Sequence, residues 1–207
     1  MNKSMSQLLE LCHVSPRICL DIVYATPDNF LGRPVYPSPH CFLQRKTAER
    51  LHRVQQALEK RGLGLKVFDG YRPHHVTKIF WDFLPDPRYV ADPAQGSRHN
   101  RGAAVDLTLM DQAGKELLMP TGFDDFSDRA HRGCSDVPLE AQKNSKILEE
   151  AMGKEGFLPF AYEWWHFDDP EWESYPILDL TFEQLLSQKA PQSSACACGK
   201  PHDRSAR

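Results

Sequence analysis

The stretch SRHNRGAAVD, residues 97–106, joins a turn-forming segment to the start of an apolar run. His99 lies in the turn, Gly102 follows it, and Asp106 lies among small and branched apolar residues. A buried carboxylate is costly without a positive partner. A hairpin-like turn through Gly102 would bring His99 and Asp106 to one metal ion that supplies this charge. Taken singly, each has a simpler interpretation, as a surface imidazole and a hydrogen-bonded buried carboxylate.

A second stretch, EWWH at residues 163–166, completes the set of groups that such a site needs. A catalytic zinc ion takes three protein ligands and keeps a position open for water. His166 is the natural third ligand, and Glu163 is the base for the water. The alternative is that the two tryptophans belong to the core and their neighbours are merely exposed. Positions three apart on a regular strand face opposite sides, so a bulge or a strand-end turn is required.

Two further polar groups suit a hydrolytic site. Arg72 follows a short apolar run and precedes Pro73, a position from which it can hold a developing oxyanion by charge-assisted hydrogen bonds. Its alternative role is an ordinary surface salt bridge. Asp124, Asp125 and Asp128 form a carboxylate cluster that could bind a substrate ammonium group, although a solvated loop is the usual meaning of such a run.

Apolar periodicity and turn residues predict the fold class. Helices are expected at residues 43–61, 74–83 and 139–152, strands at 18–24, 65–68, 103–110 and 157–167, and a proline-rich loop, which is a candidate lid, at 25–41. Strands and helices in this mixed order predict an α+β domain with a central antiparallel sheet flanked by helices. The metal site is then expected in a cleft over the sheet.

The length of 207 residues fits one domain, expected at residues 1–186. Residues 187–207 are rich in Gln, Ser, Ala, Lys and Arg, which predicts a disordered tail. Cys196, Cys198 and His202 suggest a second metal site there, but a structural zinc ion normally takes four ligands. An unstructured tail is therefore the preferred interpretation, and the metal site is the alternative.

Charge and composition restrict the partners. The chain has 25 basic and 28 acidic residues and a formal net charge of -3, so no basic field favours nucleic acid. No apolar run approaches the roughly 20 residues of a membrane helix, and the first residues lack the pattern of a signal peptide. The six scattered cysteines are expected to be reduced thiols. We expect a cytoplasmic protein, rather than a periplasmic one, with a small-molecule partner; oligomeric state is not predicted.

Both stretches, together with DGYRP at residues 69–73 and DLTL at 106–109, resemble the zinc D-Ala-D-Ala peptidases. The pattern is most similar to their VanX-type dipeptidase branch, and the resemblance spans about residues 18–180. It implies one zinc ion held by His99, Asp106 and His166. It also implies that Glu163 is the general base and that Arg72 stabilises the transition state.

The same resemblance implies that Tyr24, Ser97 and Asp124 hold the substrate, with Asp125 as an alternative to Asp124. The expected activity is hydrolysis of the D-Ala-D-Ala dipeptide by metal-activated water without a covalent enzyme intermediate. One rival is a D,D-carboxypeptidase or endopeptidase that acts on longer peptidoglycan stem peptides. Another is a binding module that keeps zinc but has lost catalysis. Glu163 disfavours the latter, because a structural site needs no base.

Overall fold

A computed structural model describes residues 8–188 of the chain. The helices are α1 (Leu11–Val14), α2 (Arg45–Glu59), α3 (His74–Phe83), α4 (Leu139–Lys154) and α5 (Phe182–Ser187). The strands are β1 (Leu8–Glu10), β2 (Cys19–Leu20), β3 (Phe42–Gln44), β4 (Leu63–Asp69), β5 (Ala104–Asp111), β6 (Leu158–Pro159) and β7 (His166–Asp168). Two short 3-10 helices, η1 (Val23–Ala25) and η2 (His99–Arg101), lie beside the site described below.

The central sheet has the strand order β2-β4-β5-β7-β6, and β1 pairs with β3 in a separate two-stranded sheet. The long strands β4 and β5 pair antiparallel, with an irregularity between Val67 and Asp69. The expected antiparallel sheet is correct except at one edge, where β2 runs parallel to β4. The chain passes from β2 to β4 through β3 and α2, and a crossover of this length is what allows parallel pairing.

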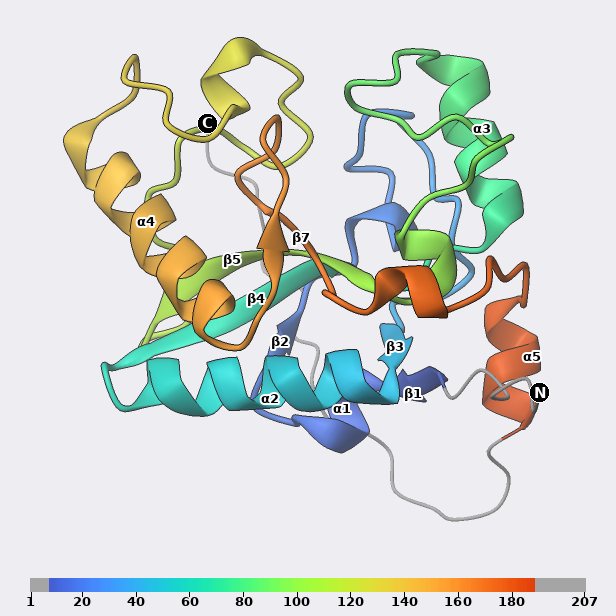
Figure 1. Ribbon diagram of the computed structural model, residues 1–207, viewed down its shortest axis with the longest axis horizontal. Coiled ribbons are helices and arrows are strands. Elements are labelled where there is room, and N and C mark those ends of the chain that lie inside the picture. Colours follow the sequence, from blue (N-terminus) through green and yellow to red (C-terminus); the bar gives the residue numbers. More distant parts are fainter. Residues whose placement is uncertain (1–7, 189–207) are drawn as a thin grey trace.

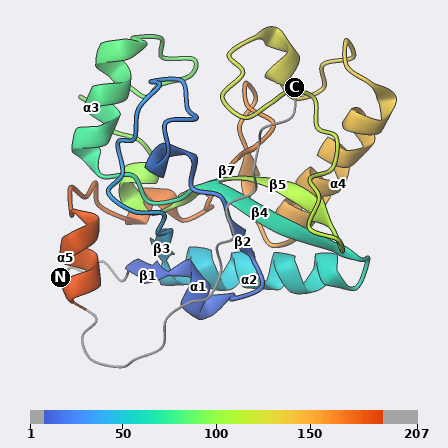
Figure 2. The same cartoon turned by 180° about the vertical axis from the view of Figure 1, so that it is seen from behind.

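The predicted α+β arrangement of helices around a sheet is confirmed (Figure 1). Helix α2 runs along one side of the sheet, while α3 and several loops lie on the other, and the view from behind shows the same layers (Figure 2). The inner face of α2 buries Ala48, Leu51, Val54 and Leu58, as the helical spacing predicts. Within the described residues, no helix has the length and apolar character needed to cross a bilayer.

Two expected strands are shorter in the structure. The segment 18–24 forms only β2 before it turns into η1, and the segment 157–167 divides into β6 and the first residues of β7 with a turn between them. Trp164 and Trp165, at the end of that turn, are both buried in the core. The predicted tail begins at the last residue of α5, and Cys196, Cys198 and His202 lie outside the described residues.

Candidate metal centre

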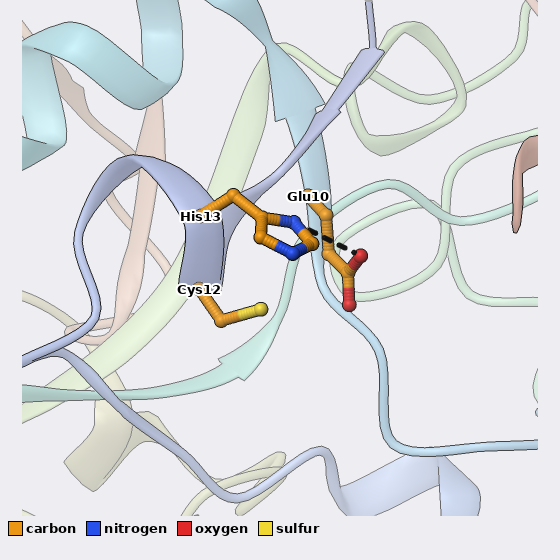
Figure 3. A group of neighbouring side chains, drawn as sticks. All are labelled: Glu10, Cys12 and His13. Atoms are coloured by element: carbon orange, nitrogen blue, oxygen red, sulfur yellow. Dashed lines mark ion pairs between the residues drawn. The ribbon is translucent and has the colours of Figure 1, made fainter. Parts of the chain in front are cut away.

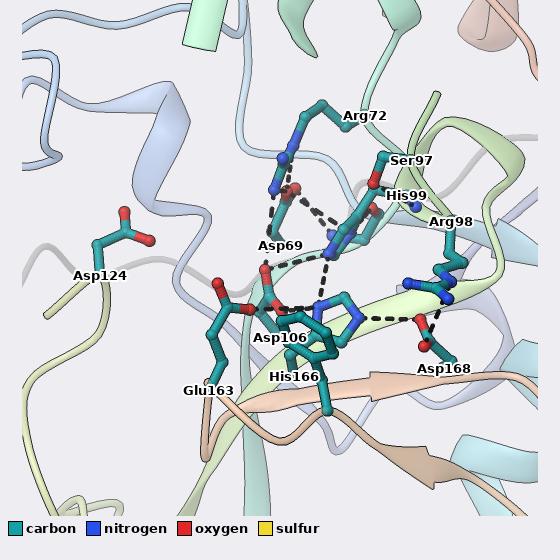
Figure 4. Close-up of polar contacts among 12 residues, drawn as sticks. Asp69, Arg72, Ser97, Arg98, His99, Asp106, Asp124, Glu163, His166 and Asp168 are labelled. Carbon is teal, nitrogen blue, oxygen red and sulfur yellow. Dashed lines mark hydrogen bonds and ion pairs between the residues drawn. The ribbon is translucent and has the colours of Figure 1, made fainter. Parts of the chain in front are cut away.

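The three predicted metal ligands come together from three segments of the chain (Figure 4). His99 lies in η2, Asp106 lies in β5, and His166 begins β7 directly opposite Asp106 in the strand register. One ligand atom from each lies within 4.8 Å of the others, and all three residues are buried. Gly102 ends η2 with a φ of 65°, the left-handed conformation that glycine tolerates, and so turns the chain from His99 into β5.

Each imidazole is oriented through its second nitrogen. His99 Nδ1 lies 2.7 Å from the carbonyl oxygen of Gly70, which directs Nε2 toward Asp106, 3.3 Å from Oδ2. His166 Nε2 lies 2.9 Å from Asp168 Oδ1, which directs Nδ1 toward the cluster. A carbonyl or carboxylate behind each ring is what metal-ligating histidines usually have. The donor set and its supports therefore fit a divalent transition metal.

The charges around the cluster also favour a cation. Burial would lower the pKa of His166, but the carboxylates of Asp168 and Asp106 outweigh it and raise that pKa to about 10. Burial alone would raise the pKa of Asp106. The charge of His99, and the hydrogen bonds that Asp106 makes with the imidazoles of His166 and His99, instead hold that pKa well below its usual range. Asp106 therefore stays ionised, and the site attracts positive charge.

Glu163 lies beside these ligands, in the turn that precedes β7. Its Oε2 is 3.7 Å from Nδ1 of His166, and the side chain is buried. The strand-end turn places both residues on one side of the chain, as their spacing requires. Burial raises the pKa of Glu163 to about 8, with a further rise from Asp106 and an opposing effect of His166. A carboxylate with a raised pKa is suited to accept a proton near neutral pH.

Arg72 is buried, so the alternative prediction that it forms an ordinary salt bridge on the surface is wrong. Its Nε and Nη2 donate to Oδ2 of Asp69 at 3.0 and 2.8 Å, and its guanidinium lies 4.5 Å above the ring centre of Phe80. Tyr36 donates its hydroxyl to the other oxygen of Asp69 at 2.8 Å. These contacts fix Arg72 with Nη2 only 3.9 Å from Asp106 Oδ2, next to the cluster.

The structure separates the two neighbouring aspartates of the predicted cluster. Tyr24 donates its hydroxyl to the carboxylate of Asp124, 3.0 Å from each oxygen, whereas Asp125 accepts from the backbone N–H of Ser127 and so holds its own loop. Asp124 has a φ of 59° and is the only residue other than glycine with a positive φ among residues 8–188. Strained backbone of this kind often occurs at functional positions. Burial and the charge of Asp106 raise the pKa of Asp124 well above its usual range.

One cavity of about 370 Å³ joins these groups. Its lining includes every predicted site residue: Tyr24, Arg72, Ser97, His99, Asp106, Asp124, Glu163 and His166. Phe30, from the proline-rich loop that we considered as a lid, also lines it. The volume is near the lower end of the roughly 300–1,000 Å³ typical of small-molecule sites. The cavity is therefore large enough for a small ligand.

Two supporting residues were not identified from the sequence. Asp69 appeared only as part of the DGYRP stretch, and Asp168 was not singled out. Asp168 has a weak sequence signal, because residues two apart on a strand share a face and His166 was already a candidate ligand. The pairing of Asp69 with Arg72 depends on the turn after β4, and no periodicity reveals it.

Imidazole and carboxylate donors at a cavity, with a buried glutamate beside them, fit the class of metal-dependent hydrolases. Sequence comparison gives the family. The model of peptidase family M15, described as D-Ala-D-Ala dipeptidase, matches residues 4–184, and the chain belongs to this metal-dependent family.

Individual relatives agree with this assignment. The chain is 36% identical to the D-alanyl-D-alanine dipeptidase of Escherichia coli, an alignment that covers 88% of this chain and 94% of that protein. It is 31% identical to the D-alanyl-D-alanine dipeptidase of Enterococcus faecium, with 75% of this chain and 89% of that protein covered.

A solved structure of the LdcB LD-carboxypeptidase is a more distant likeness, with 22% identity, a TM-score of 0.42 and coverage of 62% of this chain and 59% of that chain.

Proposed function

We propose that this protein hydrolyses the D-Ala-D-Ala dipeptide with one zinc ion held by His99, Asp106 and His166. The observation that carries the proposal is the convergence of these ligand atoms beside Glu163 in a small cavity. The names of the relatives supply the substrate. Two imidazoles and one carboxylate with an open position are the ligands of many zinc peptidases, which favours zinc over harder cations.

When bound, zinc supplies Lewis acidity and lowers the pKa of water toward about 7. Glu163 accepts the proton of the attacking water and later delivers it to the leaving amine. Arg72 donates hydrogen bonds to the oxygen that becomes negative as the peptide carbonyl is attacked. Because Asp69 and Phe80 already fix the guanidinium, little reorganisation is needed during the reaction. Water is the nucleophile, so no covalent enzyme intermediate forms.

The two ends of a free dipeptide match two sides of the cavity. Asp124, held by Tyr24, presents a carboxylate for the substrate ammonium group. The ammonium charge would reverse the raised pKa of Asp124, because an adjacent opposite charge favours the ionised form. Ser97 lies near the metal ligands, where its hydroxyl accepts from the backbone N–H of His99 at 3.2 Å and also faces the cavity. We assign Ser97 to the substrate carboxylate.

Asp124→Asn is expected to raise KM for D-Ala-D-Ala by about tenfold or more, because a hydrogen bond to a charged group contributes about 1.5–3 kcal/mol. Asparagine tolerates the left-handed backbone of this position, so folding should be kept. Steady-state kinetics of the zinc-loaded variant give KM and kcat separately.

Asp125→Asn is the matched control, since its side chain holds Ser127 instead of facing Tyr24. We expect KM of this variant to stay within about threefold of the unmodified protein. A larger rise for Asp125→Asn than for Asp124→Asn would assign the ammonium group to Asp125.

Arg72→Lys is expected to lower kcat by about a hundredfold with little change in KM, because a lysine loses the donor that faces the developing oxyanion. Lysine keeps a positive charge near Asp69, whereas alanine would leave that buried carboxylate unpaired and threaten folding. Circular dichroism checks the fold, and steady-state kinetics check the effect. A rise in KM with unchanged kcat would show that Arg72 binds the ground state.

The activity is tested by giving zinc-loaded protein three substrates at equal concentration: D-Ala-D-Ala, L-Ala-L-Ala and a stem pentapeptide that ends in D-Ala-D-Ala. We expect rapid hydrolysis of the first, little of the second and little of the third, because the cavity is small and Asp124 selects a free amine. Removal of zinc with a chelator should abolish turnover, and added zinc should restore it. Faster cleavage of the pentapeptide would favour the carboxypeptidase, and no turnover of any peptide by the zinc-loaded protein would favour the binding module.

A further inference from the structure

A second group of metal-binding side chains lies at the junction of β1 and α1. Among residues 8–188, only two clusters bring three such groups together, the centre described above and the set Glu10, Cys12 and His13. Glu10 ends β1, and the chain turns at once into α1, so that Cys12 and His13 fold back over its carboxylate (Figure 3). One ligand atom of each residue lies within 4.8 Å of the others.

The carboxylate of Glu10 is buried and held from two sides. His13 Nδ1 lies 3.3 Å from Oε2, and His40 Nδ1, from the proline-rich loop, lies 2.6 Å from Oε1. The side chain of His40 is one-third exposed and that of His13 more than half exposed. The arrangement therefore has a fixed carboxylate beneath and two imidazoles near the surface.

The chemistry of these groups selects the kind of ion. A cysteine sulfur and an imidazole nitrogen are ligands for zinc and similar transition metals, whereas calcium and magnesium require oxygen ligands. Cys12 is a half-buried thiol. We propose that Glu10, Cys12 and His13 form a second, peripheral zinc site, in which His40 orients the carboxylate from behind.

The peripheral site shares no ligand with the catalytic centre, although contacts connect the two. The backbone N–H of Leu11 donates to the carbonyl of Cys41 at 2.8 Å. Cys41 packs closely against Gly70, since a Cβ atom added to Gly70 would lie only 2.6 Å from the sulfur of Cys41. The carbonyl oxygen of Gly70 in turn lies 2.7 Å from Nδ1 of His99. An ion at the peripheral site would connect the end of β1 to α1, because it would bind the side chain of Glu10 together with those of Cys12 and His13. With three protein ligands it is expected to bind more weakly than a four-ligand structural zinc ion.

Cobalt(II) distinguishes the two sites, because a cobalt–thiolate bond gives a charge-transfer absorption in the near ultraviolet and the catalytic cluster contains no sulfur. The full chain, with one equivalent of zinc already bound, is titrated with cobalt(II). We expect a thiolate band that saturates at one equivalent. Absence of the band would overturn the proposal.

Four variants assign the band. Cys12→Ser should abolish it, and His13→Ala should weaken cobalt binding by about tenfold or more. Cys19→Ser should leave it unchanged, as should Cys196→Ser combined with Cys198→Ser, which controls for the tail thiols. Persistence in Cys12→Ser, or loss in the tail variant, would contradict the site.

His13→Ala is expected to fold normally, because His13 is exposed and lies outside the catalytic cavity. The test therefore remains informative even if Cys12→Ser fails to fold. Its turnover of D-Ala-D-Ala should stay within about twofold of the unmodified protein. Failure of D-Ala-D-Ala hydrolysis in every variant would count against the proposed function, whereas the cobalt band alone decides the peripheral site.

Discussion

Glu163→Gln is expected to lower kcat for D-Ala-D-Ala by about a hundredfold to ten-thousandfold while the protein retains its zinc. The amide keeps the shape of the side chain but cannot accept the proton of the attacking water. Glu163 lies 3.7 Å from His166 and is outside the set of three ligands, so loss of its charge should leave zinc affinity largely intact. Steady-state kinetics and metal content measured on the same sample test both halves of this expectation.

Glu183→Gln provides the matched control. Glu183 is exposed in the first turn of α5 and does not line the catalytic cavity, so its replacement should leave kcat within about twofold. Full activity in Glu163→Gln would remove the proposed base. Loss of zinc together with activity would instead make Glu163 a metal ligand.

His166→Ala is expected to abolish tight zinc binding and, with it, turnover. Loss of an outer partner of a metal ligand typically costs about 10–100-fold in affinity, and loss of a ligand itself should exceed this. The remaining carboxylates of Asp106 and Asp168 would face each other without the imidazole that now lies between them. Metal content after dialysis against a moderate chelator measures the effect, with circular dichroism as a check on folding.

His75→Ala controls for a general loss of imidazole. His75 is exposed at the start of α3, where its Nδ1 lies 2.7 Å from Asp179, and it does not line the catalytic cavity. Zinc content and turnover should be unchanged in this variant. Retention of the tightly bound zinc equivalent by His166→Ala would exclude His166 from the ligand set.

Local sequence signals predicted much of the fold because they reflect local physics. The range of α3 agrees with the expected residues 74–83, where Pro73 starts the helix, and β5 differs from its expected range by one residue at each end. Strand length was less predictable. Aromatic residues favour strands in general, but residues 157–167 contain a turn between β6 and β7, with Trp164 and Trp165 buried at its end.

The chemistry of the site residues was enough to predict that they lie together. It did not predict the residues that hold them in place, Asp69 and Asp168. His99 and Asp106 are joined by a glycine turn, and a motif sufficed to link them with His166. Asp69 has no local pattern that distinguishes it from a surface aspartate, and Asp168 has only its spacing of two residues from His166. Their roles become clear when the turn after β4 and the face of β7 are placed in space. The parallel pairing of β2 with β4 was also not predicted, because a strand of two residues carries little periodicity.

The central claim is that one zinc ion binds to two imidazole nitrogens and one aspartate oxygen. X-ray absorption at the zinc edge, on full-length protein loaded with a single equivalent of zinc, tests this most directly. The account predicts only nitrogen and oxygen neighbours at about 2.0–2.2 Å, with an imidazole signature that fits two histidine rings. A sulfur neighbour at about 2.3 Å in that first equivalent would place the ion on a cysteine and contradict the account.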